Sequence, residues 1–183
     1  MQTGFTRLTS YIQGKNKEEM KIKMTAPVMS YVEPGSGPLS EPAITNSLYI
    51  PSGQQSDPPR PAESNVFIED RAEMMVFVRS FDGFSSAQKN QEQLLTLASI
   101  LREEGKVFNE KVYSTAGYNS PFKLLDRNNE VWLIQKNEPS KEREREKERK
   151  VYSLGQNLCL TQTSSLPISK MYLVSLPEST TVN

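Results

Sequence analysis

The chain of 183 residues contains no histidine. Histidine is the commonest metal ligand, proton shuttle and general base in proteins. Its absence excludes Ser-His and Cys-His catalytic pairs as well as zinc sites built on histidine. A single cysteine, Cys159, likewise excludes an intramolecular disulfide and fits a reducing compartment.

The sequence also lacks long apolar runs and an excess of either charge. No apolar run approaches the length of about 20 residues that spans a bilayer, so we expect no transmembrane segment. The 22 basic and 22 acidic side chains balance, and no overall field favours nucleic acid or an anionic membrane. Apolar residues make up 36% of the chain, which indicates that part of it lies outside a packed core.

The segments that remain are short and periodic, in an order typical of an α+β fold. Helical spacing predicts a helix over 5–12 that ends at Gly14, and a capping box at Ser85 and Gln88 opens a second helix over 85–104. Strands are expected at 24–32, 44–50, 66–71, 73–81, 111–118 and 130–136.

Two of the predicted strands carry further information. Pro27 lacks the N–H that a sheet ladder needs, so its strand should be an edge, a bulge or a strand start at this point. The middle of 73–81 is apolar on both faces, which predicts a central strand covered on both sides.

The composition changes towards the end of the chain. Residues 141–150 read KEREREKERK, an alternation of charges that favours either a solvated single helix or disorder. Residues 151–183 are rich in Ser and Thr and lack periodicity. We therefore predict a folded domain over 1–138, a charged low-complexity segment over 139–150 and a mostly disordered tail over 151–183.

Five ordered segments carry a family resemblance. They are KIKMTAPV (21–28), YIPSGQQSDPPRP (49–61), FVRSFDGFSS (77–86), STAGYNSP (114–121) and NEVWLI (129–134). Together they resemble the SOUL heme-binding protein family over about residues 2–138, whereas the tail from Pro139 onward resembles nothing in it. The resemblance implies a distorted antiparallel sheet, curled into a barrel-like form, with two helices on its outside and an internal pseudo-duplication.

The resemblance also implies that a strand is missing. Family members carry a further strand before the first helix, and the histidine proposed as a heme ligand lies in that strand. Nothing in this sequence replaces that histidine at the same place. We therefore expect an incomplete sheet and no histidine-ligated heme.

A groove for heme or another porphyrin is implied at four positions. They are Arg7, Leu8, Tyr11 and Tyr118. Arg7 would pair with a propionate, and Tyr118 would stack on the ring or hydrogen-bond to it. The alternative is that Arg7 is a solvated helix residue and that both tyrosines are packing residues.

The axial ligand of such a heme stays open. Thioether and thiol sulfur are the softer donors that the sequence offers. Met24, Met74 and Met75 are expected to fill the core, and Cys159 falls in the tail as an inert thiol. Any heme binding is therefore expected to be weak.

Residues 97–111 resemble the death-motif helix by which pro-apoptotic proteins dock into survival proteins. The resemblance places the anchors at Leu97, Leu101, Gly105 and Phe108. Glu104 and Lys106 depart from the motif, because an apolar anchor and an aspartate are expected there. The alternative is that the leucines pack this helix on the sheet, so partner binding would require the helix to detach.

An enzyme has the weakest support. Glu69, Asp70 and Glu73 cluster, but the pattern favours a solvated turn between two strands over a catalytic carboxylate pair. The resemblance points to a non-catalytic heme- or porphyrin-binding protein of the cytosol and mitochondria, linked to mitochondrial permeability and cell death. The alternatives are an interaction module that permeabilises mitochondrial membranes through survival proteins without a ligand, and a truncated variant with neither activity.

Overall fold

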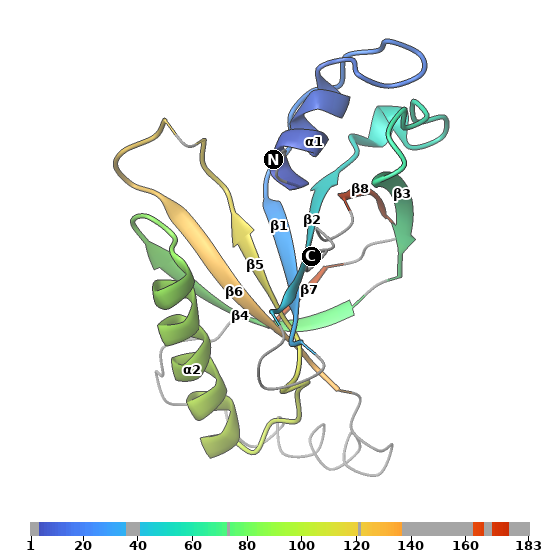
Figure 1. Ribbon diagram of the computed structural model, residues 1–183. Helices are drawn as coiled ribbons and strands as arrows, with labels where there is room; N and C mark the ends of the chain where they lie inside the picture. The colour runs from blue at the N-terminus through green and yellow to red at the C-terminus, as the bar shows by residue number, and fades with distance from the viewer. Residues whose placement is uncertain are drawn as a thin grey trace.

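The computed structural model describes residues 4–35, 41–72, 74–120, 122–136, 163–166 and 170–175. The elements are α1 (Gly4–Ile12), β1 (Val28–Glu33), β2 (Ala43–Tyr49), the short 3-10 helix η1 (Ser52–Gln54), β3 (Val66–Arg71), β4 (Met74–Asp82), α2 (Ala87–Glu103), β5 (Tyr113–Gly117), β6 (Asn128–Ile134), β7 (Thr163–Leu166) and β8 (Lys170–Ser175). The predicted α+β class is confirmed (Figure 1).

The strands form one sheet in the order β3-β8-β2-β1-β5-β6-β4-β7, and neighbours are antiparallel. β3 and β7 stand at its two ends, and no pairing joins them among the described residues. The sheet is therefore open, and the expectation of a barrel is wrong to that extent. β1 begins at Val28, directly after Pro27, so the proline marks a strand start as its missing N–H requires.

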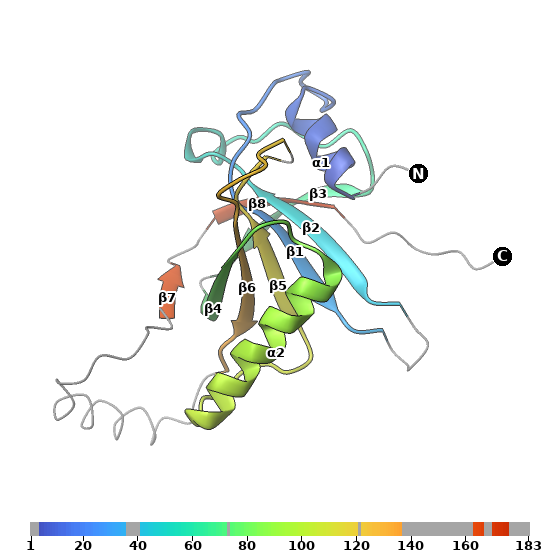
Figure 2. The same ribbon diagram turned by 90° about the vertical axis from the view of Figure 1, so that its left-hand side faces the viewer.

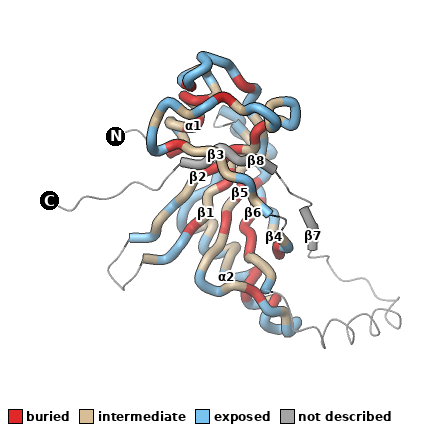
Figure 3. The backbone as a smooth tube through the Cα atoms, turned by 90° about the vertical axis from the view of Figure 1, so that its right-hand side faces the viewer, coloured by how far each residue is buried: buried red, intermediate tan, exposed pale blue. Residues whose placement is uncertain are grey.

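Helix α2 packs on one face of the sheet, over β4 and β6 (Figure 2). Leu97 and Leu101 are fully buried in a cluster that includes Phe77, Val131 and Leu133. Figure 3 colours these buried stretches of β6 and α2 red. Burying each leucine stabilises the packing by roughly 1.5–3 kcal/mol, which fixes the helix on the sheet.

The start of α2 differs from the prediction by one residue. Ser86 is the N-cap, and its hydroxyl accepts a hydrogen bond from the Lys89 amide at 3.1 Å. The Ser85 hydroxyl instead donates to the Asn90 side chain at 2.8 Å. The capping box at Ser85 is thus wrong, because the backbone enters the helix one residue later.

Helix α1 covers the neighbouring part of the same sheet face. Leu8 and Tyr11 pack with Leu48 and Ile50 in a second buried cluster. Leu48 of β2 faces this cluster, whereas the next residue, Tyr49, packs with a third cluster. Because successive strand residues point to opposite faces, the third cluster lies on the face of the sheet away from α1.

The third cluster occupies the face that neither helix covers. Its buried members are Met29, Val76, Ala116 and Trp132. In β6, Trp132 lies between two residues that face α2, so the alternation agrees with that seen in β2. Val76 and its neighbour Phe77 are 2% and 3% exposed, which confirms the prediction of a central strand covered on both sides.

Two strands arise from the segment that was expected to be a disordered tail. β8 pairs with both β2 and β3, with Leu173 opposite Leu48 and Ile68, and β7 pairs with β4. The structure thus describes two strands within this segment, and disorder of its other residues stays a prediction. The charged segment 139–150 and the rest of the tail lie outside the described residues.

Candidate functional site

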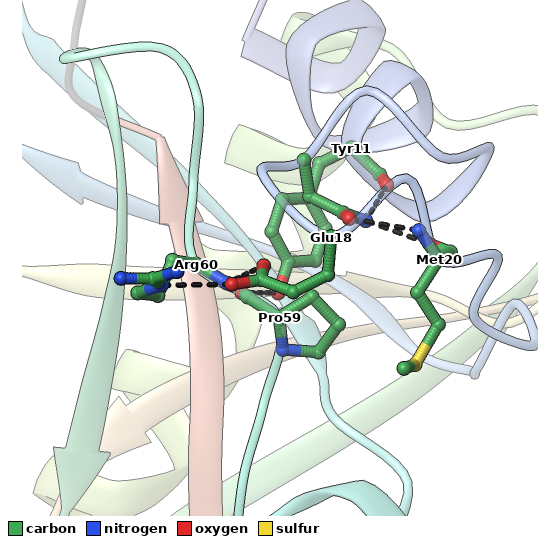
Figure 4. A network of polar contacts seen from close by, with 6 residues as sticks. Tyr11, Glu18, Met20, Pro59 and Arg60 are labelled. Atoms are coloured by element: carbon green, nitrogen blue, oxygen red, sulfur yellow. Dashed lines mark hydrogen bonds and ion pairs between the residues drawn. The ribbon is translucent and has the colours of Figure 1, made fainter.

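Tyr11 anchors α1 to a proline-rich loop (Figure 4). Its hydroxyl is buried and donates to the carbonyl oxygen of Pro59. Burial, with a smaller contribution from the charge of Glu18, raises the pKa of Tyr11 to about 12. Glu18 in turn accepts hydrogen bonds from the Arg60 amide at 2.6 Å and from its Nε at 2.7 Å. The Tyr11 hydroxyl is therefore engaged in holding the fold.

The other two predicted groove residues on α1 are also engaged. Leu8 is 0% exposed, at the centre of the second cluster. Arg7 is half-buried and already takes part in an interaction within the protein. A ligand at α1 would have to displace these contacts.

Tyr118 belongs to a different polar network. Its hydroxyl donates to Glu130 Oε2 at 2.8 Å, and Trp132 Nε1 donates to the same oxygen at 2.8 Å. Burial is the main cause that raises the pKa of Tyr118, and the hydrogen bond to Glu130 and its charge add to it. Tyr118 is therefore a neutral hydrogen-bond donor at physiological pH.

The structure does not bring the predicted groove residues onto one surface. Leu8 and Tyr11 pack in the second cluster, whereas Tyr118 packs against the third, on the opposite face of the sheet. They share one end of the sheet, because Gly117 pairs with Val28, a residue that packs against the second cluster. Spacing in the sequence could not show which face each side chain takes.

A cavity of about 400 Å³ opens on the face without helices. Its walls come from five strands and the residue after β3: Met29, Tyr31, Glu69, Asp70, Arg71, Ala72, Met74, Ser114 and Ile134. Most of the lining is apolar side chain, with charge gathered on the β3 side. The volume falls in the range of roughly 300–1,000 Å³ typical of small-molecule sites.

The chemistry of this cavity combines thioethers, a phenol and one cation. Arg71 has 17% of its side chain exposed, and its Nε contacts Glu69 Oε2 at 2.7 Å. Burial, and less so the charge of Glu33, raises the pKa of Tyr31, while Arg71 opposes this shift. The lining also holds the carboxylates of Glu69 and Asp70, so it suits a flat apolar group whose carboxylate replaces Glu69 at Arg71.

Sequence reasoning missed this cavity. The available signal was the second apolar face of two strands, on which Met29 and Met74 lie. The expectation that the methionines fill the core is wrong for Met24 and Met75, which are 44% and 41% exposed. Met75 belongs to the face that carries α2, but it lies at the end of β4 beyond the buried cluster beneath the helix.

The predicted partner-binding anchors do not form one helical face. Leu97, Leu101 and Phe108 are buried together in the cluster beneath α2. The helix ends at Glu103, and Gly105 follows with a φ of 68°, a left-handed conformation that favours glycine. Partner binding by these residues stays a prediction, and it requires α2 to leave the sheet.

The acidic cluster offers no sign of a metal or catalytic centre in the described part of the chain. Glu69 is paired with Arg71, and Glu73 lies outside the described residues. Among the described residues no group of three or more His, Cys, Asp or Glu side chains could hold a metal ion. None of the described helices is long and apolar enough to cross a membrane.

Comparison with known proteins identifies relatives over most of the chain. Heme-binding protein 2 of Homo sapiens is 85% identical over 144 residues, which cover 79% of this chain and 70% of that protein. The Mus musculus protein of the same name is 82% identical over 142 residues, covering 78% and 69%. Heme-binding protein 1 of Xenopus laevis is 31% identical over 134 residues, covering 73% and 70%. The family described as SOUL heme-binding protein matches residues 1–134, and the chain therefore belongs to this family.

Proposed function

We propose that this protein binds heme or a related porphyrin and does not act as a catalyst. The family is named for heme binding and not for a reaction. The observation that supports a particular site is the apolar cavity on the face without helices, which places the mostly buried Arg71 beside two thioethers. A porphyrin needs an apolar slot and a cation for its propionates, and this cavity offers both.

The described residues have distinct roles in this proposal. Met29, Met74 and Ile134 would contact the macrocycle, and Arg71 would exchange its Glu69 partner for a propionate. Heme iron can take thioether or phenolate ligands as well as histidine, so the methionines and Tyr31 are the available donors. The need to displace Glu69 and the lack of histidine both favour weak binding.

A hemin titration of the untagged full chain, followed by Soret absorbance, tests the proposal. Arg71→Gln and Met74→Leu should weaken binding if the cavity is the site, whereas Arg102→Gln, an exposed arginine paired with Glu110, should not. Weaker binding in Tyr118→Phe and Arg7→Gln alone would place the ligand in the groove that the family resemblance implies. No saturable binding by the unmodified chain would overturn the function itself.

The spectrum of the complex provides a second readout. Because the chain has no histidine, bound hemin should lack the signature of a histidine-ligated iron. A polyhistidine tag would introduce that ligand, so the tag must be removed before the titration. A histidine-type spectrum from the untagged chain would mean that another molecule supplies the ligand.

We also propose, from the family resemblance, a place in the cytosol and mitochondria and a role in mitochondrial permeability and cell death. Docking to survival proteins is the second candidate function. Its support is the apolar stripe of α2, and its obstacle is that Leu97 and Leu101 are 0% exposed. Amide exchange in β4 and β6, which would lose the helix that covers them, should accelerate when a survival protein is added. Unchanged exchange in these strands would count against this function.

A further inference from the structure

The loop between β5 and β6 presents three large apolar side chains to solvent. Phe122, Leu124 and Leu125 are 91%, 71% and 77% exposed, more than any other large apolar side chain in the described part of the protein. Figure 1 shows this loop extending beyond the ends of both strands. An exposed apolar group of this kind marks an interaction site more often than ordinary surface.

A fourth apolar side chain joins them from the turn between β4 and α2. Phe84 is 56% exposed, and the guanidinium of Arg127 lies 4.7 Å from the centre of its ring. Asn129 Nδ2 also donates to the Gly83 carbonyl at 2.7 Å, so the two loops are fixed side by side. We call Phe84, Phe122, Leu124 and Leu125 the apolar tip.

The loop that carries the apolar tip is braced from within. One terminal nitrogen of Arg127 donates to the carbonyls of Ser120 and Lys123, at 2.9 and 2.6 Å. The Asn128 amide donates to the Asn119 side chain at 2.5 Å. These bonds hold the apolar side chains outward before any partner arrives, which lowers the entropic cost of binding.

The charge around the apolar tip is slightly positive, in contrast to the neutral chain as a whole. Lys123 lies between Phe122 and Leu124 in the sequence, and Arg127 follows two residues after Leu125. Asp126 is the one carboxylate within 119–128. Aromatic and leucine side chains interleaved with cations are typical of segments that lie in the headgroup region of a bilayer.

We propose that the apolar tip docks the protein on the surface of an anionic lipid bilayer. Phe122, Leu124 and Leu125 enter the boundary between headgroups and acyl chains, and Lys123 faces lipid phosphates. Arg127 keeps its contacts within the loop and with Phe84. A protruding loop fits a planar, deformable surface, and this loop offers neither the helix face nor the strand edge by which many peptide segments are recognised. The site is separate from the proposed heme cavity, which is lined by other residues.

Flotation of the full chain with lipid vesicles tests this inference. The protein should float with phosphatidylcholine–phosphatidylserine vesicles, and about fivefold more weakly with phosphatidylcholine alone. Leu124→Ser combined with Leu125→Ser should reduce binding about tenfold or more, because it removes apolar area that enters the lipid. Leu95→Ser, at a 60% exposed position on α2, is the matched control and should bind as the unmodified chain does.

Charge and insertion depth give independent readouts. Lys123→Glu should weaken binding only to the anionic vesicles. Lys111→Glu should leave binding unchanged, because Lys111 precedes β5 at the end of the strand opposite to the loop. A Phe122→Trp variant should be quenched by brominated lipids if the loop inserts, and this measurement decides the matter if the double serine variant misfolds. The inference is overturned if the unmodified chain floats with neither vesicle, if a folded double variant floats equally well, or if no quenching occurs.

Discussion

At the scale of single residues, two tyrosines connect separate elements through their hydroxyl groups. Tyr11 bonds to Pro59 from α1, and Tyr118 shares Glu130 with Trp132. The Tyr11 hydroxyl is buried and that of Tyr118 is partly buried, so the neutral form of each is favoured in the folded state. These contacts explain why residues that could have lined a ligand groove serve the fold.

The raised pKa of Tyr11 predicts a loss of stability in alkali. The unfolded tyrosine ionises near its ordinary pKa of 10.0, whereas the folded one does so at about 12. The stabilisation is complete below pH 10.0 and is lost as the pH rises towards 12, by up to about 3 kcal/mol. Denaturant melts across this window should show a shallower loss for Tyr11→Phe. The remainder is due to Tyr31, Tyr113 and Tyr118, whose pKa values burial also raises. Parallel pH profiles would contradict the role of Tyr11.

At the scale of elements, α2 depends on its cap and on its buried stripe. The cap lies at Ser86 and not at the neighbouring serine that the sequence pattern favoured. Leu97 and Leu101 pack against the sheet, so exposing them to a partner would remove a large part of the core. The helix is therefore a structural element in the described fold.

Two neighbouring serine substitutions test the cap. Ser86→Ala removes the hydroxyl that accepts from the Lys89 amide and should lower the free energy of unfolding by about 1 kcal/mol. Ser85→Ala is the matched control, since its exposed hydroxyl bonds only to the Asn90 side chain in the described network, and about 0.5 kcal/mol or less is expected. Thermal or urea melts of both variants give the comparison. Equal effects would mean that the cap contributes no more than the neighbouring contact.

At the scale of the whole molecule, β8 joins β2 to β3 within the sheet. β8 stands between β2 and β3, and its removal would leave both neighbours with unpaired N–H and C=O groups. Domains are stable by only about 5–15 kcal/mol, so one lost strand can remove much of that margin. β8 is therefore part of the folded unit in this structure.

Truncated chains test whether β7 and β8 contribute to the stability of the fold. A chain ending at Lys136 should unfold at a lower denaturant concentration and aggregate more readily than the full chain, because β7 and β8 are gone. A chain ending at Ser175 keeps both strands and should behave like the full chain. Equal midpoints for all three would show that the sheet is stable without β8.

Local pattern was enough to establish both helices and the strands β1 to β6 from the sequence alone, but not β7 and β8. The predicted strand over 66–71 coincides with β3, and the other predicted strands and both helices are shifted by only a few residues. Such signals depend on neighbours a few positions apart, so they survive without knowledge of the fold. Five ordered segments were likewise enough to identify the family.

The tertiary structure alone decided which side chains meet. The sequence placed Tyr118 with Leu8 and Tyr11, but pairing of the strands put them on opposite faces of the sheet. Residues of five strands line the cavity. β8 pairs with β2 and β3, which lie about 100 residues or more before it in the sequence. Contacts between such distant segments depend on which strands pair, and pairing across such separations cannot be read from residues a few positions apart.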